Sequence, residues 1–149
     1  MPISVMLKPA SSNCNLACEY CFYHSLSSKR DDFSKGFMSE NTARKVIDSA
    51  LDFAKGTDVF FTFQGGEPLL CSLDFYKNFV LYAKSVNKKG SNIHYCLQTN
   101  GTLITDEYAA FFKNNNFLIG VSLDGDFELN KYRIYPNGKT GYYAVDLTE

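Results

Sequence analysis

Three cysteines close together are the residues of this chain whose spacing most clearly indicates chemistry. Cys14, Cys18 and Cys21 form the pattern C-x3-C-x2-C. Thiolates this close can bind several irons of one cubane cluster, and a cubane held by only three thiolates leaves one iron open to an external ligand. Zinc is the alternative, with His24 as a fourth ligand, although structural zinc sites normally use two separated pairs of ligands.

The other cysteines do not form a second motif. Cys71 is expected at the start of a helix and Cys96 in a strand, so both are interpreted as core or half-buried thiols. An odd total of five cysteines argues against a closed disulfide framework. Free thiols that bind a metal fit the reducing cytoplasm better than an oxidising compartment.

Polar or glycine-rich sequences follow the other three expected strands. They are Gln64-Gly65-Gly66-Glu67-Pro68, Gln98-Thr99-Asn100-Gly101 and Ser122-Leu123-Asp124-Gly125. Ligands of parallel α/β folds bind at the carboxyl ends of strands, so these sequences and the cysteine loop are expected on one rim. Gly65 and Gly66 would let the backbone approach a ligand closely, and Glu67 would offer a carboxylate to an ammonium group. The alternative is a plain strand-to-helix turn with an acid at the helix start.

The elements that must position these residues alternate between strand and helix. Strands are predicted at 3–8, 59–64, 92–99 and 117–123, and the cysteine loop at 11–28. Helices are predicted at 42–54 after the N-cap Ser39, at 72–86, and from the cap Thr105 to about 112, and 142–147 is considered as the start of another helix. This order predicts an α/β fold with a parallel sheet and right-handed crossovers. The nearly continuous apolar strands predict helices on both faces, and a partial barrel and a doubly wound sheet both fit.

Composition and charge exclude several classes of function. Hydrophobic residues make up 45% and charged residues 21%, as in ordinary soluble globular proteins. The net charge is −1 and no long basic block is present, which argues against nucleic-acid binding. No apolar run approaches the roughly 20 residues that a membrane span needs. The N-terminus has no signal-peptide pattern, so a cytoplasmic protein is expected.

Several sequence strings resemble one known family. The cysteine loop with the aromatics Phe22 and Tyr23 after it, and the later GGEP, TNG and SLDG sequences, resemble radical S-adenosylmethionine (SAM) enzymes. The longer strings KPASS, CFYHSL, FQGGEP and LQTNGTL are similar to those of anaerobic sulfatase-maturating enzymes. The resemblance extends from about residue 4 to residue 133.

The resemblance implies a fold, a reaction and partners. The fold would be an incomplete (β/α)6 partial TIM barrel, of which about four β/α units are present. A [4Fe–4S] cluster would cleave SAM to a 5′-deoxyadenosyl radical, which would start the oxidation of a Cys or Ser side chain of a sulfatase to Cα-formylglycine. The partners would be a sulfatase polypeptide and a cytoplasmic electron donor such as flavodoxin or ferredoxin.

The resemblance also implies a role for each matching residue. Cys14, Cys18 and Cys21 would bind the cluster. Tyr23 and Gln64 would be catalytic residues near the adenosyl group and the target side chain. The SAM-binding residues would be Tyr23, Gly65, Gly66, Glu67, Gln98, Asn100, Ser122 and Arg133. Arg133, which would contact the SAM carboxylate, follows a segment one residue shorter than the family pattern, with Asp126 where proline is usual.

Two features of the family are not found in residues 1–149, namely the last strands of the barrel and a C-terminal domain with auxiliary clusters. The chain is therefore expected to be the N-terminal portion of a radical SAM domain, incomplete for turnover. Two other functions remain as alternatives. One is a different radical SAM peptide maturase that forms thioether or carbon–carbon crosslinks, and the other is a non-catalytic Fe–S or metal module.

Overall fold

The protein contains one sheet of four parallel strands in the order β1-β2-β3-β4. The computed structural model describes residues 1–141, apart from the side chains of His24 and Phe127. The strands are β1 (Ile3–Leu7), β2 (Val59–Phe63), β3 (Ile93–Thr99) and β4 (Phe117–Val121). The helices are α1 (Phe22–Ser27), α2 (Glu40–Ala54), α3 (Ser72–Val86), α4 (Asp106–Asn114) and α5 (Phe127–Asn130), with a 3-10 helix at Pro68–Cys71. The parallel sheet and its α/β order confirm the predicted fold class.

The predicted cap residues start two of the long helices. The Ser39 hydroxyl accepts the Thr42 N–H at 3.1 Å, before α2, and Thr105 does the same for Tyr108, before α4. These caps satisfy backbone N–H groups that have no partner inside the helix. The helix considered within 142–147 lies outside the described residues. No helix in the described part of the chain is long and apolar enough to cross a membrane.

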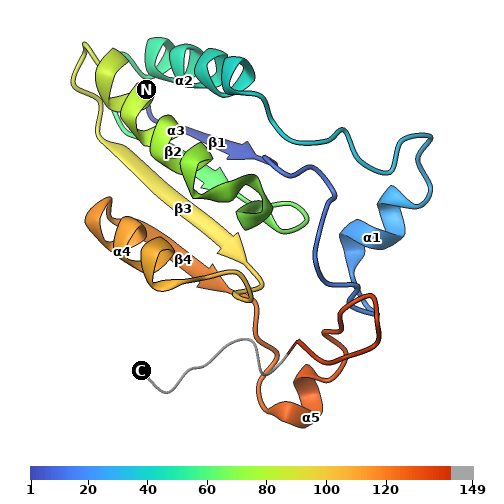
Figure 1. Ribbon diagram of the computed structural model, residues 1–149. Coiled ribbons are helices and arrows are strands. Elements are labelled where there is room, and N and C mark those ends of the chain that lie inside the picture. Colours follow the sequence, from blue (N-terminus) through green and yellow to red (C-terminus); the bar gives the residue numbers. More distant parts are fainter. Residues whose placement is uncertain (142–149) are drawn as a thin grey trace.

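The three long helices, α2, α3 and α4, all lie on the same face of the sheet (Figure 1). A single core joins them to the strands, with Phe61 and Phe63 fully buried and the Phe63 ring centroid 5.0 Å from that of Phe79. The opposite face is uncovered in the described structure, and Met6 and Leu118 there are 61% and 71% exposed.

The prediction of helices on both faces is therefore wrong. Consecutive strands are also neighbours in the sheet, so the strand order never reverses. Right-handed crossovers without a reversal place every helix on the same side. This topology belongs to a barrel wall and excludes the doubly wound alternative. Apolar residues on both faces of the strands do not distinguish a barrel wall from a doubly wound sheet, because a barrel interior also takes apolar side chains.

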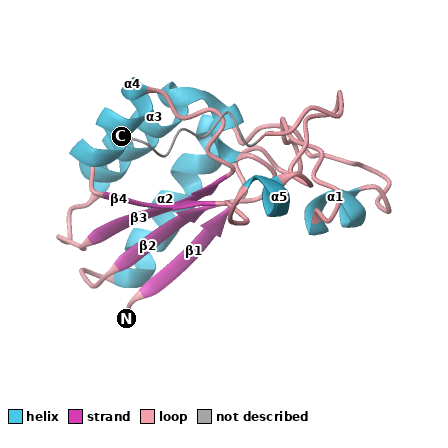
Figure 2. Ribbon diagram, turned by 90° about the horizontal axis from the view of Figure 1, so that it is seen from below, coloured by secondary structure: helices cyan, strands magenta, loops and turns pink. Residues whose placement is uncertain are grey.

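Two short helices, α1 and α5, lie beyond the carboxyl ends of the strands (Figure 2). The sequence analysis predicted neither, and it placed the cysteine loop over the residues of α1. α1 has six residues and α5 has four, which is too short for apolar periodicity to reveal them. Cys21 immediately precedes α1, so this helix orients the last of the three thiols.

The turn after β2 binds the start of the cysteine loop through the backbone. The Gly66 N–H donates to the Ser11 carbonyl at 3.0 Å, and the Glu67 N–H donates to the Asn13 carbonyl at 2.7 Å. A Cβ on Gly66 would lie 2.0 Å from the Asn13 oxygen. Gly65 has φ +126°, and a Cβ there would lie 2.8 Å from the Ser11 oxygen. Glycine is therefore needed at both positions because the protein's own loop comes so close.

Substitution of Gly66 tests this attachment. Because the added methyl meets backbone, Gly66→Ala is expected to displace the cysteine loop and lower the free energy of unfolding by about 1–3 kcal/mol. Gly90→Ala is the control, since a Cβ at Gly90 meets nothing within 4 Å and only its φ of +68° is strained. Chemical denaturation measures the free energy of unfolding, and the rates of cysteine alkylation measure how exposed the thiols of the loop are. The rate at Cys14 should rise in Gly66→Ala only, and equal rates in both variants would contradict the attachment.

Candidate functional site

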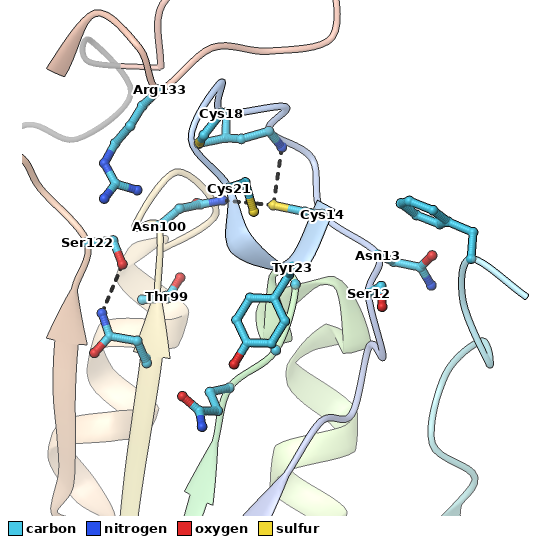
Figure 3. A pocket seen from close by; sticks show the side chains of 16 residues that line it. Ser12, Asn13, Cys14, Cys18, Cys21, Tyr23, Thr99, Asn100, Ser122 and Arg133 are labelled. Atoms are coloured by element: carbon cyan, nitrogen blue, oxygen red, sulfur yellow. Dashed lines mark hydrogen bonds between the residues drawn. The ribbon is translucent and has the colours of Figure 1, made fainter. Parts of the chain in front are cut away.

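A cavity of about 290 Å³ opens at the carboxyl ends of the strands (Figure 3). The strand ends and the cysteine loop form its walls, as expected for a parallel α/β fold. Its lining includes every predicted site residue except Glu67, namely Cys14, Cys18, Cys21, Tyr23, Gln64, Gly65, Gly66, Gln98, Asn100, Ser122 and Arg133. The topology thus brings together residues from four separate parts of the chain.

The three thiols of the loop are free and partly buried. The Leu16 N–H donates to the Cys14 sulfur at 3.4 Å, and the Cys21 N–H donates to the Cys18 carbonyl at 3.0 Å. Burial is the main cause that raises the pKa of Cys14. Burial also raises the pKa of Cys18, although the positive charge of Arg133 opposes this shift. Without a metal, both sulfurs therefore favour the protonated form.

The three thiols of the loop share one end of the cavity. All three sulfurs line it, and Figure 3 shows them close to one another at its upper end. In the described part of the chain, no group of three His, Cys, Asp or Glu side chains is arranged to hold a single metal ion.

Glu67 takes a different position from the one expected. Its side chain is fully buried, and it does not line the cavity. Its carboxylate accepts the Leu69 N–H at 2.9 Å, the Thr99 hydroxyl at 2.8 Å and the Asn100 N–H at 2.7 Å. Burial raises the pKa of Glu67, and these hydrogen bonds oppose that shift. The carboxylate is thus occupied in joining the end of β2 to the end of β3, and it does not face a ligand.

The remaining polar residues of the rim contact other side chains of the protein. Gln98 donates to the Ser122 hydroxyl at 2.9 Å, which links β3 to the residue after β4. Gly120 makes room for this pair, because a Cβ there would lie 2.3 Å from the Gln98 amide oxygen. Gln64 donates to the Met6 sulfur on the uncovered face of the sheet. Tyr23 is near a cation, with the Lys8 ammonium 4.7 Å from its ring centroid.

Arg133 lines the cavity and is paired with residues beside it. Its guanidinium binds the Asp124 carboxylate at 2.8 Å, and the Tyr20 hydroxyl donates to the same carboxylate. Burial would raise the pKa of Asp124, but the hydrogen bonds from Arg133 and Tyr20 outweigh it and lower the pKa. The buried Nε of Arg133 has no hydrogen-bond partner in the described structure. Arg133 therefore lines the cavity with one buried N–H group that has no acceptor in the described structure.

The cavity also contains residues that the sequence analysis did not select. They are Ser12, Asn13, Leu16, Phe33 and Thr99. Ser12, Asn13 and Leu16 flank Cys14, so their position beside the motif was the available signal. Phe33 lies far from any motif in the sequence, and no pattern indicated it. Thr99 was part of the strand-end string, where its role in binding Glu67 could not be seen.

Curated proteins similar to this chain include sulfatase-maturating enzymes. The chain is 45% identical over 144 residues to a cysteine-type anaerobic sulfatase-maturating enzyme of Clostridium novyi (strain NT). It is 41% identical over 145 residues to a serine-type enzyme of Bacteroides thetaiotaomicron. These alignments cover 96% and 97% of this chain, but the chain spans only 38% and 35% of the two relatives.

Solved structures show the same architecture. Native anSMEcpe with bound AdoMet matches with a TM-score of 0.88 and 40% identity, over 95% of this chain and 38% of that one. The same protein with bound AdoMet and Kp18Cys peptide matches with a TM-score of 0.88 and 38% identity, over 97% of this chain and 38% of that one.

A family model covers most of the chain. The model of the radical SAM superfamily matches residues 9–144, which include the cysteine loop and the strands β2, β3 and β4, and begin after the end of β1. The match agrees with the parallel sheet, the single helical face and the three free thiols described above. The chain therefore belongs to the radical SAM superfamily.

Proposed function

We propose that this chain is the cluster- and SAM-binding portion of an anaerobic sulfatase-maturating enzyme. The observation that carries the proposal is the single cavity that the three loop thiols share with the polar ends of β2, β3 and β4. The whole enzyme would oxidise a Cys or Ser side chain of a sulfatase to Cα-formylglycine. Similarity to both cysteine-type and serine-type enzymes supports this substrate class and leaves the target residue open.

Cys14, Cys18 and Cys21 would hold a [4Fe–4S] cluster, which when bound supplies the electron for reductive cleavage of SAM. Cys14 and Cys18 must lose their protons to bind iron, since burial raises the pKa of each. With no fourth cysteine in the loop, one iron of the cluster would remain open to SAM.

The rest of the lining would bind and orient SAM and the target side chain. Arg133 would bind the SAM carboxylate, which its unpartnered Nε supports because a buried N–H favours an acceptor. Gly65 and Gly66 would present the backbone to the amino group. Ser122, Gln98 and Asn100 would border the polar end and the ribose. A cavity of about 290 Å³ is near the lower end of ligand-pocket sizes, roughly 300–1,000 Å³.

Tyr23 and Gln64 would be the catalytic residues near the adenosyl group and the target side chain. Figure 3 shows the Tyr23 ring between the cysteines and the sheet. Gln64 follows the last residue of β2 and contacts Met6 on the uncovered face. Both side chains would therefore border the path from the cluster to a peptide. The electron donor would be a cytoplasmic flavodoxin or ferredoxin, and the enzyme would work without oxygen.

Removal of one thiol tests the cluster. After anaerobic reconstitution with iron and sulfide, Cys18→Ala is expected to bind at least about tenfold less iron than the unsubstituted chain. The reason is that losing a cluster ligand should weaken iron binding more than losing a residue that only contacts a ligand. Cys96→Ala is the matched control, since Cys96 is half-buried in β3 and does not line the cavity. Iron and sulfide analysis gives the result. Equal iron loss in both variants would contradict the assignment.

Reaction with SAM separates the proposed reaction from its alternatives. We expect the reconstituted chain with dithionite and SAM to form 5′-deoxyadenosine but little formylglycine on a sulfatase peptide, because β4 lacks a neighbour on one edge in the described structure. Mass spectrometry measures both products. No 5′-deoxyadenosine would indicate a non-catalytic metal module. Efficient formylglycine formation would show that these 149 residues suffice. In the complete enzyme, a thioether or carbon–carbon crosslink in place of formylglycine would indicate another peptide maturase.

A further inference from the structure

Asn100 binds the cysteine loop with its side chain, although its sequence position suggested a contact to SAM or substrate. Its amide nitrogen lies 3.7 Å from the Cys14 sulfur and 2.9 Å from the Asn15 amide oxygen. The first distance is within the range of hydrogen bonds to sulfur. Figure 3 shows this contact between the end of β3 and the first thiol of the loop.

The orientation of the Asn100 amide follows from its other end. The Asn100 amide oxygen accepts the Thr102 backbone N–H at 3.0 Å and the Thr102 hydroxyl at 2.7 Å. A backbone N–H can only donate, so the atom that faces it must be the oxygen. The NH₂ group must then face Cys14 and Asn15. Asn15 completes a ring of hydrogen bonds by donating to the Thr102 hydroxyl at 2.8 Å.

The backbone of Asn100 is also fixed by a hydrogen bond. Its N–H donates to the fully buried Glu67 carboxylate at 2.7 Å, and Glu67 also accepts the Thr99 hydroxyl. Glu67 itself is attached to the start of the cysteine loop, through its N–H to the Asn13 carbonyl. Glu67 thus connects to Asn100 through its carboxylate and to the residue before Cys14 through its N–H. These two connections keep the N–H···S contact in place.

We propose that Asn100 is a positioning residue for the cluster, which directs an N–H at the Cys14 sulfur and makes the cluster easier to reduce. Reduction adds one electron, from an external reductant, and increases the negative charge on the cluster and its sulfurs. An N–H donor stabilises the more negative state, and hydrogen bonds to the sulfurs are one of the determinants of cluster potential. The inference rests on the proposed function, because it requires a cluster on Cys14.

Two substitutions and one control test the proposal. Asn100→Leu removes the donor at similar size, and Asn100→Asp keeps the acceptor for Thr102 but puts a negative charge beside the sulfur. Asn41→Asp is the control, because it adds the same charge at an exposed position in the first turn of α2, where acids are favourable. Each reconstituted protein is titrated with dithionite, and the reduced cluster is followed by EPR.

At a fixed potential, Asn100→Leu should show an about tenfold lower ratio of reduced to oxidised cluster, equal to about 59 mV for a one-electron couple. Asn100→Asp should shift further in the same direction, and Asn41→Asp should match the unsubstituted protein. Unchanged potentials in both Asn100 variants would overturn the proposal. Loss of the cluster from both would also overturn it, since Asn100 would then only hold the loop. Failure of the unsubstituted chain to assemble a cluster would instead refute the proposed function.

Discussion

The site depends on the attachment of the turn after β2 to the start of the cysteine loop. Two backbone hydrogen bonds join Gly66 and Glu67 to Ser11 and Asn13, and the loop comes so close that a Cβ on Gly66 would lie 2.0 Å from the Asn13 oxygen. The Glu67 side chain then extends this attachment to the end of β3 through Thr99 and Asn100. A long loop that contains only the short helix α1 is thereby held against two strands, and its thiols keep a defined position at the rim.

The strands, the long helices and the rim could be predicted because their signals are local. Apolar periodicity gave α3 at its observed bounds, and the N-caps Ser39 and Thr105 gave the starts of α2 and α4. The carboxyl ends of parallel strands always share one edge of a sheet, so the position of the polar strand ends followed from the fold class. The cysteine spacing was visible without any structure at all.

The parts that could not be predicted depend on contacts between distant residues. Glu67 was expected to contact a ligand because its three hydrogen-bond donors are not apparent in the sequence, and two of them come from the distant end of β3. The two glycines line the cavity, but their close approach to the protein's own loop could not be seen in the sequence. The one-sided packing of helices likewise depends on strand order, which apolar patterns in single strands do not reveal.

The contacts around Arg133 have a consequence for how this protein loses its structure. Tyr20 and Asp124, which meet beside the cavity, are 104 positions apart in the chain, and Arg133 joins them from a third segment. A contact between positions far apart in the chain forms only after the entropy cost of closing a long loop has been overcome. The core, in contrast, forms between neighbouring β/α units. The contacts around Arg133 are therefore expected to open at a lower free energy than the core, so that gentle heating should release them while amide protons of the sheet still resist exchange.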